Sequence, residues 1–180
     1  MEFFYVDDVL VITAEQMKTL DGIRVVFKLK AEKAENLDMY LGALLSELET
    51  ADGTKCWTMS SEKYVKAVIE NVESRLDTSN LRLPSRCDTP MSTSYYPSED
   101  VTREMNAKGL HTYQELIRIR GWEIEIRRID ILLEVSLLSS HLAFPRIGHL
   151  QAVYRIFGYL KQVPKRRLYF DPKKPIISED

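Results

Sequence analysis

The stretch FFYVDDVLVIT, residues 3–13, carries the strongest local indication of the fold. Two short runs of aromatic and β-branched residues surround two adjacent aspartates, Asp7 and Asp8. Each run is too short for a helix, and paired aspartates suit a tight turn, so the stretch predicts a β-hairpin. Adjacent carboxylates repel each other and burial raises their pKa values, a conflict that a divalent cation between them relieves. A solvent-exposed turn without a metal is the plain alternative.

Short β-like segments and one clear helix are expected after the hairpin. In order, they are a short helix over 14–22 ended by Gly22, β-like segments over 23–30 and 39–45, a turn over 47–53, a strand over 55–59 and a helix over about 61–76. The last helix has Ser60-Ser61 as its N-cap signal, and its apolar residues share one face. Trp57, Tyr64 and Tyr154 are candidates for the core before they are candidates for stacking on a ligand.

A long irregular stretch divides the chain. Residues 77–109 are rich in Asp, Ser, Thr and Pro, which predicts a linker or an extended strap and a candidate subdomain boundary. The β-rich part precedes the helical part, and this order indicates an α+β fold. The expected division is a β-rich part over 1–58, a helix with linker over 59–92 and a helical part over 93–180.

The sequence of the second half predicts three helices. Thr112 and Glu115 have the spacing of a capping box, which would open the first helix. Asp130 is a candidate N-cap of the second helix, which would end at a Phe-Pro pair. A third helix is expected over 147–162, followed by a strand and a proline-broken tail over 167–180.

Composition narrows the class of protein. The chain has 180 residues, a net charge of −2 and no run of about 18 apolar residues that could cross a bilayer. The N-terminus has no secretory pattern, so a non-secreted protein is expected. Cys56 and Cys87 form no CxxC motif; two reduced thiols are expected, with a disulfide as the alternative. Residues 112–167 carry 10 basic and 5 acidic side chains, which fits an anionic partner or a solvated helix face.

Several motifs together resemble the reverse transcriptases of copia-type LTR retrotransposons. The sequence YVDD followed by VLVIT resembles the catalytic hairpin of these enzymes. The other matching segments are FKLK at 27–30, YLGALL at 40–45, KCWTMSSEKYVKAVIENVE at 55–73, TYQELI at 112–117 and the stretch 127–164 with its Pro-x-x-x-His element. They cover nearly the whole chain in the family's order. The resemblance implies part of a polymerase palm, with its antiparallel sheet, followed by a thumb-like helix and a helical connection toward RNase H.

The resemblance also implies roles for individual residues. Asp7 and Asp8 match carboxylates that hold two Mg²⁺ ions, and Tyr5 and Val6 match positions that flank the template–primer duplex. Lys30 lies near a motif that approaches the incoming nucleotide, with a solvated strand lysine as the alternative. Implied partners are an RNA or DNA template–primer and deoxynucleotides, with no membrane. The implied location is a particle in the cytoplasm, or the nucleus.

Activity is not expected from these residues alone. The family's third catalytic carboxylate and its fingers precede YVDD, which begins here at Tyr5, and the RNase H carboxylates would follow the last residue. Two local departures from the family are the arginines of IRIRGW at 117–122, where an apolar helix is usual, and Arg127-Arg128-Ile129, where Arg-Pro or Gly-Arg-Val is usual. A buried, unpaired arginine costs several kcal/mol, so these positions suggest drift in a decaying copy, with a surface that tolerates insertions as the alternative.

Two other hypotheses remain open. The first is a non-catalytic module that binds nucleic acid or assembles with a partner. It would do so through basic residues near the C-terminus: Lys161, Lys165, Arg166 and Arg167. The second is a chain of marginal stability whose exposed edge strands promote self-association. His149, in the Pro-x-x-x-His element, is interpreted as structural.

Overall fold

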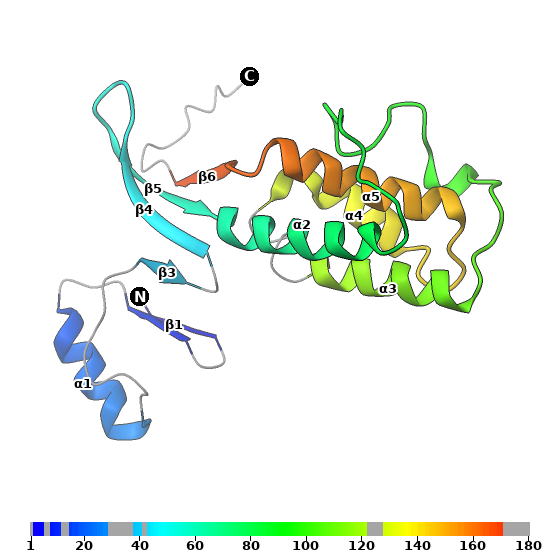
Figure 1. Ribbon diagram of the computed structural model, residues 1–180. Helices are drawn as coiled ribbons and strands as arrows, with labels where there is room; N and C mark the ends of the chain where they lie inside the picture. The colour runs from blue at the N-terminus through cyan, green and yellow to red at the C-terminus, as the bar shows by residue number, and fades with distance from the viewer. Residues whose placement is uncertain are drawn as a thin grey trace, which may run out of the picture.

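The computed structural model describes residues 2–5, 8–11, 15–28, 38–40, 43–121 and 128–170. The expected mixed α+β class is confirmed in this part of the chain (Figure 1). Its elements are β1 (Glu2–Tyr5), β2 (Asp8–Val11), α1 (Gln16–Val26), β3 (Met39–Tyr40), β4 (Ala43–Glu49), β5 (Lys55–Ser60), α2 (Glu62–Asp77), η1 (Pro97–Glu99), α3 (Ala107–Gly121), η2 (Ile129–Ile131), α4 (Leu132–Ser139), α5 (Ile147–Gln162) and β6 (Arg167–Phe170).

The strands form two antiparallel sheets. The predicted hairpin is present as β1 paired with β2, and the second sheet has the order β3-β4-β5-β6. Strand β6 comes from the far end of the chain and pairs with β5, so it returns the polypeptide to the sheet after the helices (Figure 1). The predicted turn between β4 and β5 contains Gly53 at a positive φ of 77°, a conformation that glycine adopts without steric strain.

Helix α1 corrects the prediction for 14–30. It continues through Gly22 to Val26, so residues 23–26 are helical and not β-like. Gly22 does not adopt the left-handed conformation with which glycine terminates helices, and a Cβ added to it would have no neighbouring atom within 4 Å. The β-branched residues after Gly22 favoured a strand. The β propensity of such residues is weak and depends on context, so it did not end the helix.

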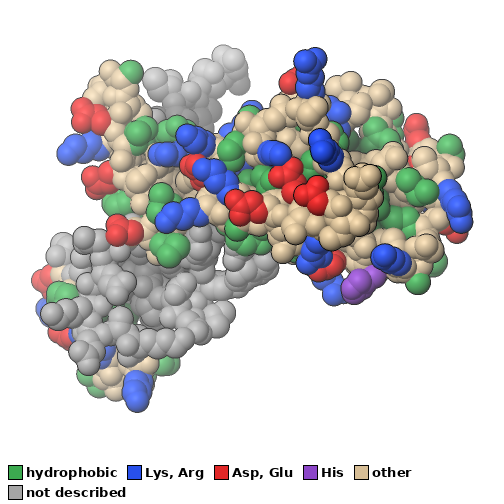
Figure 2. Space-filling view, viewed as in Figure 1, with side chains coloured by type: hydrophobic (Ala, Val, Ile, Leu, Met, Phe, Trp, Pro, Cys, Tyr) green, Lys and Arg blue, Asp and Glu red, His purple; other side chains and the backbone are tan. Residues whose placement is uncertain are grey.

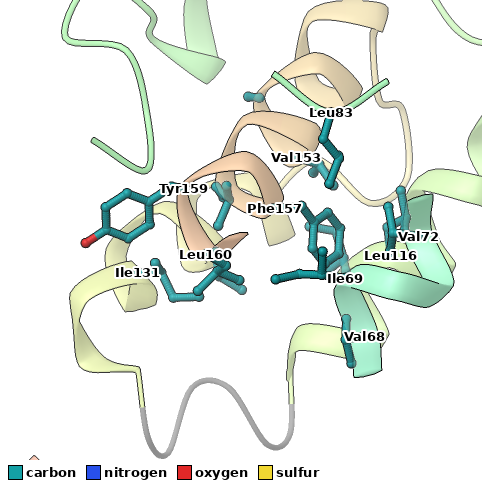
Figure 3. Close-up of a cluster of buried hydrophobic side chains, with 14 of the residues drawn as sticks. Val68, Ile69, Val72, Leu83, Leu116, Ile131, Val153, Phe157, Tyr159 and Leu160 are labelled. Atoms are coloured by element: carbon teal, nitrogen blue, oxygen red, sulfur yellow. The ribbon is translucent and has the colours of Figure 1, made fainter. Parts of the chain in front are cut away.

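Helices α2, α3, α4 and α5 enclose the main core. The helix predicted over 61–76 is confirmed, with its apolar face buried. Helix α5 has the predicted bounds, and Phe157 and Leu160 on it are fully buried. Side chains from α2, α3 and α5 converge around Phe157, with Leu83 of the irregular stretch beside them (Figure 3). Removal of this apolar cluster from water is the main source of stability for the helical part.

The long irregular stretch is a strap that packs against this core. Leu83 and Cys87 are buried in it, and Pro97 is buried in η1. Gly158 on α5 permits the close approach, because a Cβ there would lie 2.6 Å from the Pro84 carbonyl oxygen and 2.9 Å from the Cys87 Sγ. Cys56 and Cys87 are both free and buried, as expected for reduced thiols.

Two of the predicted helix starts are wrong. Helix α3 begins at Ala107, where the Asn106 side chain accepts a hydrogen bond from the Gly109 amide at 2.9 Å. Thr112 therefore lies inside the helix, and Glu115 binds Arg75 of α2 at 2.7 Å instead of closing a capping box. The local pattern was right for a cap, but the carboxylate has a tertiary partner.

The second helix also departs from its prediction. Asp130 lies within η2 and caps no helix with its side chain, and α4 ends at Ser139, well before Pro145. Near this end, the Ser139 and Ser140 hydroxyls donate to carbonyls of the preceding turn, at 2.7 Å each. Such local side-chain bonds compete with the helical pattern and favour its end.

Candidate nucleic-acid interface

The first and last residues of the YVDD motif lie at the facing ends of the two hairpin strands. Tyr5 ends β1 and is paired with Asp8, the first residue of β2. Val6 and Asp7 lie outside the described residues, as do the side chains of Tyr5 and Asp8 and all of Lys30. The metal and nucleotide roles of these residues therefore stay predictions. Within the described part of the chain, no group of three or more His, Cys, Asp or Glu side chains is arranged to hold a metal ion.

The four predicted basic residues lie along the path from α5 into β6. Lys161 is in the last turn of α5, and Lys165 and Arg166 follow the helix. Arg167 begins β6 opposite Ser60, the residue with which β5 ends next to α2. The tertiary structure thus brings these basic side chains to the junction of α2, α5 and the sheet.

Acidic side chains accompany this basic cluster. Lys161 Nζ lies 2.6 Å from Glu73 Oε1, and Arg166 Nη1 lies 3.3 Å from Asp130 Oδ2. A hydrogen bond from Lys66 holds the pKa of Glu62 below its usual value, and the nearby charges of Lys165 and Arg167 lower it further. Figure 2 shows red and blue side chains interleaved over α2. Exposed ion pairs of this kind contribute little stability, so a phosphate could compete for the cations.

A buried arginine defines the geometry of this junction. Arg128 is 1% exposed, and its Nε and Nη2 bind the two carboxylate oxygens of Asp130 at 2.8 and 2.9 Å. Its Nη1 donates to the carbonyl oxygen of Val163 at 3.1 Å, directly after α5. The cost of a buried, unpaired arginine therefore does not apply to Arg128: the side chain is buried but has a bidentate partner, which is the arrangement that offsets the desolvation of a charge.

Asp130 is the centre of a small network. The Tyr159 hydroxyl donates to its Oδ2 at 2.8 Å, and the guanidinium carbons of Arg128 and Arg166 lie 5.8 and 5.5 Å from the Tyr159 ring centre. Burial alone would raise the pKa of Asp130, but the bonds from Arg128 and Tyr159 and the nearby charges outweigh it and hold the pKa below its usual value. This network fixes the direction in which the chain leaves α5.

Sequence reasoning missed this network. The signal was present in the stretch RRID, where Arg128 and Asp130 are two residues apart. That spacing allows the pair to form locally, but the contributions of Tyr159 and Val163 come from about 30 residues further along the chain and depend on the helix packing.

The Pro-x-x-x-His element joins α5 to the strap. The buried His149 accepts a hydrogen bond from the Arg146 amide at Nδ1, at 2.9 Å, and its Nε2 lies 2.9 Å from the Pro97 carbonyl oxygen. Because a carbonyl oxygen only accepts, Nε2 carries the proton. The His141 ring stacks on His149 at 4.3 Å between centroids. These contacts support the structural interpretation of His149.

A cleft of about 600 Å³ lies between α2, the strap and α5. Its lining includes Glu73, Asp77, Arg82 and Lys161, so it carries both signs of charge. The ion pair between Glu73 and Lys161 joins α2 to α5 beside it. Nothing in this lining favours one class of ligand.

Comparison of the chain with models of protein families, with curated proteins and with solved structures gave no match. Among the described helices, none is long and apolar enough to cross a membrane.

Proposed function

We propose that the chain is the C-terminal part of the reverse transcriptase domain of a copia-type LTR retrotransposon polyprotein, from the YVDD hairpin through the thumb and connection. The observation that supports this proposal is the pairing of Tyr5 with Asp8 across two antiparallel strands. That register leaves Val6 and Asp7 between the paired residues, the spacing of the shortest hairpin connections. The pairing of Tyr5 with Asp8 is compatible with the hairpin that the resemblance implies.

The proposed chemistry belongs to the complete polymerase. There, carboxylates such as Asp7 and Asp8 hold two Mg²⁺ ions, which clamp the attacking and leaving oxygens when a deoxynucleotide is added to a primer 3′-hydroxyl. Template–primer and deoxynucleotides are the proposed partners, and a retrotransposon particle in the cytoplasm or the nucleus is the proposed location. We propose that a polypeptide limited to these residues does not polymerise, because two carboxylates without a third hold metal weakly.

Metal binding tests the assignment of Asp7 and Asp8. The expected result is weak Mn²⁺ binding, measured by water proton relaxation, that is lost in Asp7→Asn/Asp8→Asn. The control Asp52→Asn alters an aspartate of the described turn between β4 and β5, and it should leave Mn²⁺ binding unchanged. Equal binding by the wild type and the double variant would refute the metal assignment.

Primer extension on an RNA template with Mg²⁺ tests the proposed inactivity separately. We expect no extension from the folded 180-residue chain. Extension that disappears in Asp7→Asn/Asp8→Asn would contradict the inactivity and support the polymerase assignment.

A non-catalytic nucleic-acid-binding role is the second candidate. The observation that favours it is the gathering of basic side chains at the α5–β6 junction, where Lys165 and Arg167 have no ion pair with a described residue at the distances found for Lys161 and Arg166. Two phosphate contacts predict a slope of about −1.8 in a plot of log affinity against log salt, and four contacts about −3.6.

The basic residues can be tested by substitution. Lys165→Ala/Arg167→Ala should weaken binding to any duplex sequence and remove most of the salt dependence. The control Arg103→Ala/Lys108→Ala removes two exposed cations from another part of the chain and should have little effect. Unchanged binding in the first variant would exclude this interface.

A further inference from the structure

The strap places an exposed hydroxyl group next to an arginine of α5. Thr89 lies in an irregular part of the strap, outside any helix or strand, and is exposed. Its Oγ1 accepts a hydrogen bond from Arg155 Nη2 at 3.3 Å and donates one to the carbonyl oxygen of Met91 at 2.7 Å. The contact with Arg155 joins two segments that are 66 residues apart in the chain. Thr89 is therefore an accessible hydroxyl held beside a cation.

The hydrogen bonds of Arg155 are incomplete at this contact. Its Nε is buried and has no hydrogen-bond partner. In a guanidinium group, Nε and Nη2 share one edge, and Arg128 uses the same edge to bind both carboxylate oxygens of Asp130. The single oxygen of a hydroxyl group fills one position of this fork, whereas an oxyanion fills both. Because a buried donor without a partner is unfavourable, the edge of Arg155 favours a ligand with two acceptor oxygens.

The charge of Arg155 is not neutralised by a carboxylate in direct contact. None of the salt bridges between described residues includes Arg155. The nearby ionisable groups of the strap are the Asp88 carboxylate and the Cys87 thiol. Burial raises the pKa of this thiol, and the charges of Arg155 and Asp88 act on that pKa in opposite directions. Asp88 opposes the binding of an anion here, so the anion must form direct bonds to the guanidinium group.

The sequence around Thr89 indicates how an anion could be supplied. Thr89-Pro90 is the only Ser-Pro or Thr-Pro dipeptide in the 180 residues. A proline disfavours the helical conformation for the residue before it, and this favours the extended backbone in which protein kinases bind their substrates. Kinases directed by proline accept a Ser or Thr followed by proline, which has no N–H group that would need a partner in the kinase groove. The dipeptide and the open edge of Arg155 thus meet at the same hydroxyl.

We propose that Thr89 is a phosphorylation site for a proline-directed protein kinase and that Arg155 binds the resulting phosphate. The kinase transfers the γ-phosphoryl group of ATP. A bond forms between Thr89 Oγ1 and phosphorus, the bond from phosphorus to the leaving ADP breaks, and the hydroxyl proton passes to the catalytic aspartate of the kinase. Thr89 then loses its bond to the Met91 carbonyl oxygen, and Nε and Nη2 of Arg155 gain phosphate oxygens. The inference does not depend on the polymerase proposal, since it uses only the strap and α5.

The phosphate should hold the strap more firmly against α5. It carries a charge of about −1.5 to −2 at pH 7 and forms charge-assisted hydrogen bonds with arginine. These bonds replace the single contact of 3.3 Å between the Thr89 hydroxyl and Arg155. The expected result is an increase of at least about 2 °C in the melting temperature of the phosphorylated chain.

Phosphorylation of the folded 180-residue chain tests the site. The probe is a mitogen-activated protein kinase with ATP and Mg²⁺, and mass spectrometry locates the phosphate. The wild type should be phosphorylated at Thr89, and both Thr89→Ala and Pro90→Ala should abolish the reaction. The matched control is Thr78→Ala, which alters an exposed threonine that no proline follows and should leave phosphorylation unchanged. A folded chain that is not phosphorylated, or is phosphorylated only at other residues, would overturn the proposal.

The ³¹P chemical shift of the phosphorylated chain tests the role of Arg155. The second pKa of phosphothreonine is about 6 in an unfolded chain, and a guanidinium group lowers it because it favours the dianion. The titration midpoint should therefore be lower in the folded wild type than in the same chain unfolded in urea, a comparison that needs no variant. Arg155→Met should remove most of this difference and of the gain in melting temperature. The control Arg86→Met, which alters an exposed arginine of the same strap, should keep both. Equal midpoints in the folded and unfolded wild type would overturn the assignment of Arg155, and so would equal effects of the two variants.

Discussion

Removal of the Asp130 carboxylate should be one of the most destabilising single changes in the chain. Asp130→Ala leaves the guanidinium of Arg128, which is 1% exposed, without its bidentate partner. Arg128 keeps its hydrogen bond to the Val163 carbonyl oxygen, but this oxygen accepts from only one of the five N–H donors of the guanidinium. Breaking a buried ion pair by removing one partner costs about 3–5 kcal/mol. This is a large fraction of the about 5–15 kcal/mol that stabilises a typical domain.

Removal of the arginine should cost less. In Arg128→Met, Asp130 keeps the Tyr159 hydroxyl and the Arg166 side chain as partners, at 2.8 and 3.3 Å. The carboxylate is also partly exposed, so water can solvate it. We expect a loss of about 1–2 kcal/mol for this variant.

The double variant Arg128→Met/Asp130→Ala tests whether the loss of stability in Asp130→Ala comes from the unpaired charge of Arg128. It removes both charges and should be more stable than Asp130→Ala alone, because no buried charge remains without a partner. Urea unfolding followed by circular dichroism would measure all three free energies of unfolding. The reasoning is refuted if Asp130→Ala costs less than about 1 kcal/mol, or if the two single losses simply add in the double variant.

Three further predictions concern packing, pH and a buried hydroxyl. Gly158→Ala should lower the free energy of unfolding by about 1–3 kcal/mol, because its Cβ would lie 2.6 Å from the Pro84 carbonyl oxygen. The control Gly22→Ala, with nothing within 4 Å, should be neutral or stabilising by up to about 1 kcal/mol, and equal melting temperatures would contradict this contrast. Burial holds the pKa of His141 below its usual value of 6.5, so the unfolded chain binds the proton more readily and stability should fall as the pH drops below 6.5. Urea midpoints at about pH 7.5 and about pH 5.5 should differ less in His141→Gln, and an unchanged difference would exclude this residue as the source. Tyr113→Phe should cost about 1–2 kcal/mol in thermal unfolding, because it removes a buried hydrogen bond of 2.6 Å to a carbonyl of α4, and a change within error would contradict it.

The elements with strong local signals were predictable. The hairpin alternates apolar runs around a turn, α2 has a single apolar face, and α5 lies between Pro145 and Pro164. Each of these signals is contained in consecutive residues, so no knowledge of the tertiary structure was needed to interpret it.

The elements that were predicted wrongly had local signals with tertiary competitors. Glu115 has the spacing of a capping box with Thr112, but its carboxylate binds Arg75 on another helix. Asp130 resembles an N-cap, but its oxygens bind Arg128 and Tyr159. A carboxylate that can cap a helix can equally well bind a cation, and only the packing of the helices decides which partner is within reach.

The sequence by itself determined the β-rich and helical order of this protein, the faces that its longest helices bury and the pairing of β1 with β2 in a hairpin. The tertiary structure alone decided that Arg128 is buried with a partner and that the basic residues at the end of α5 and after it meet acidic ones. Periodicity and caps act over a few neighbouring residues, whereas ion pairs and face burial depend on segments that are far apart in the chain and meet only after folding.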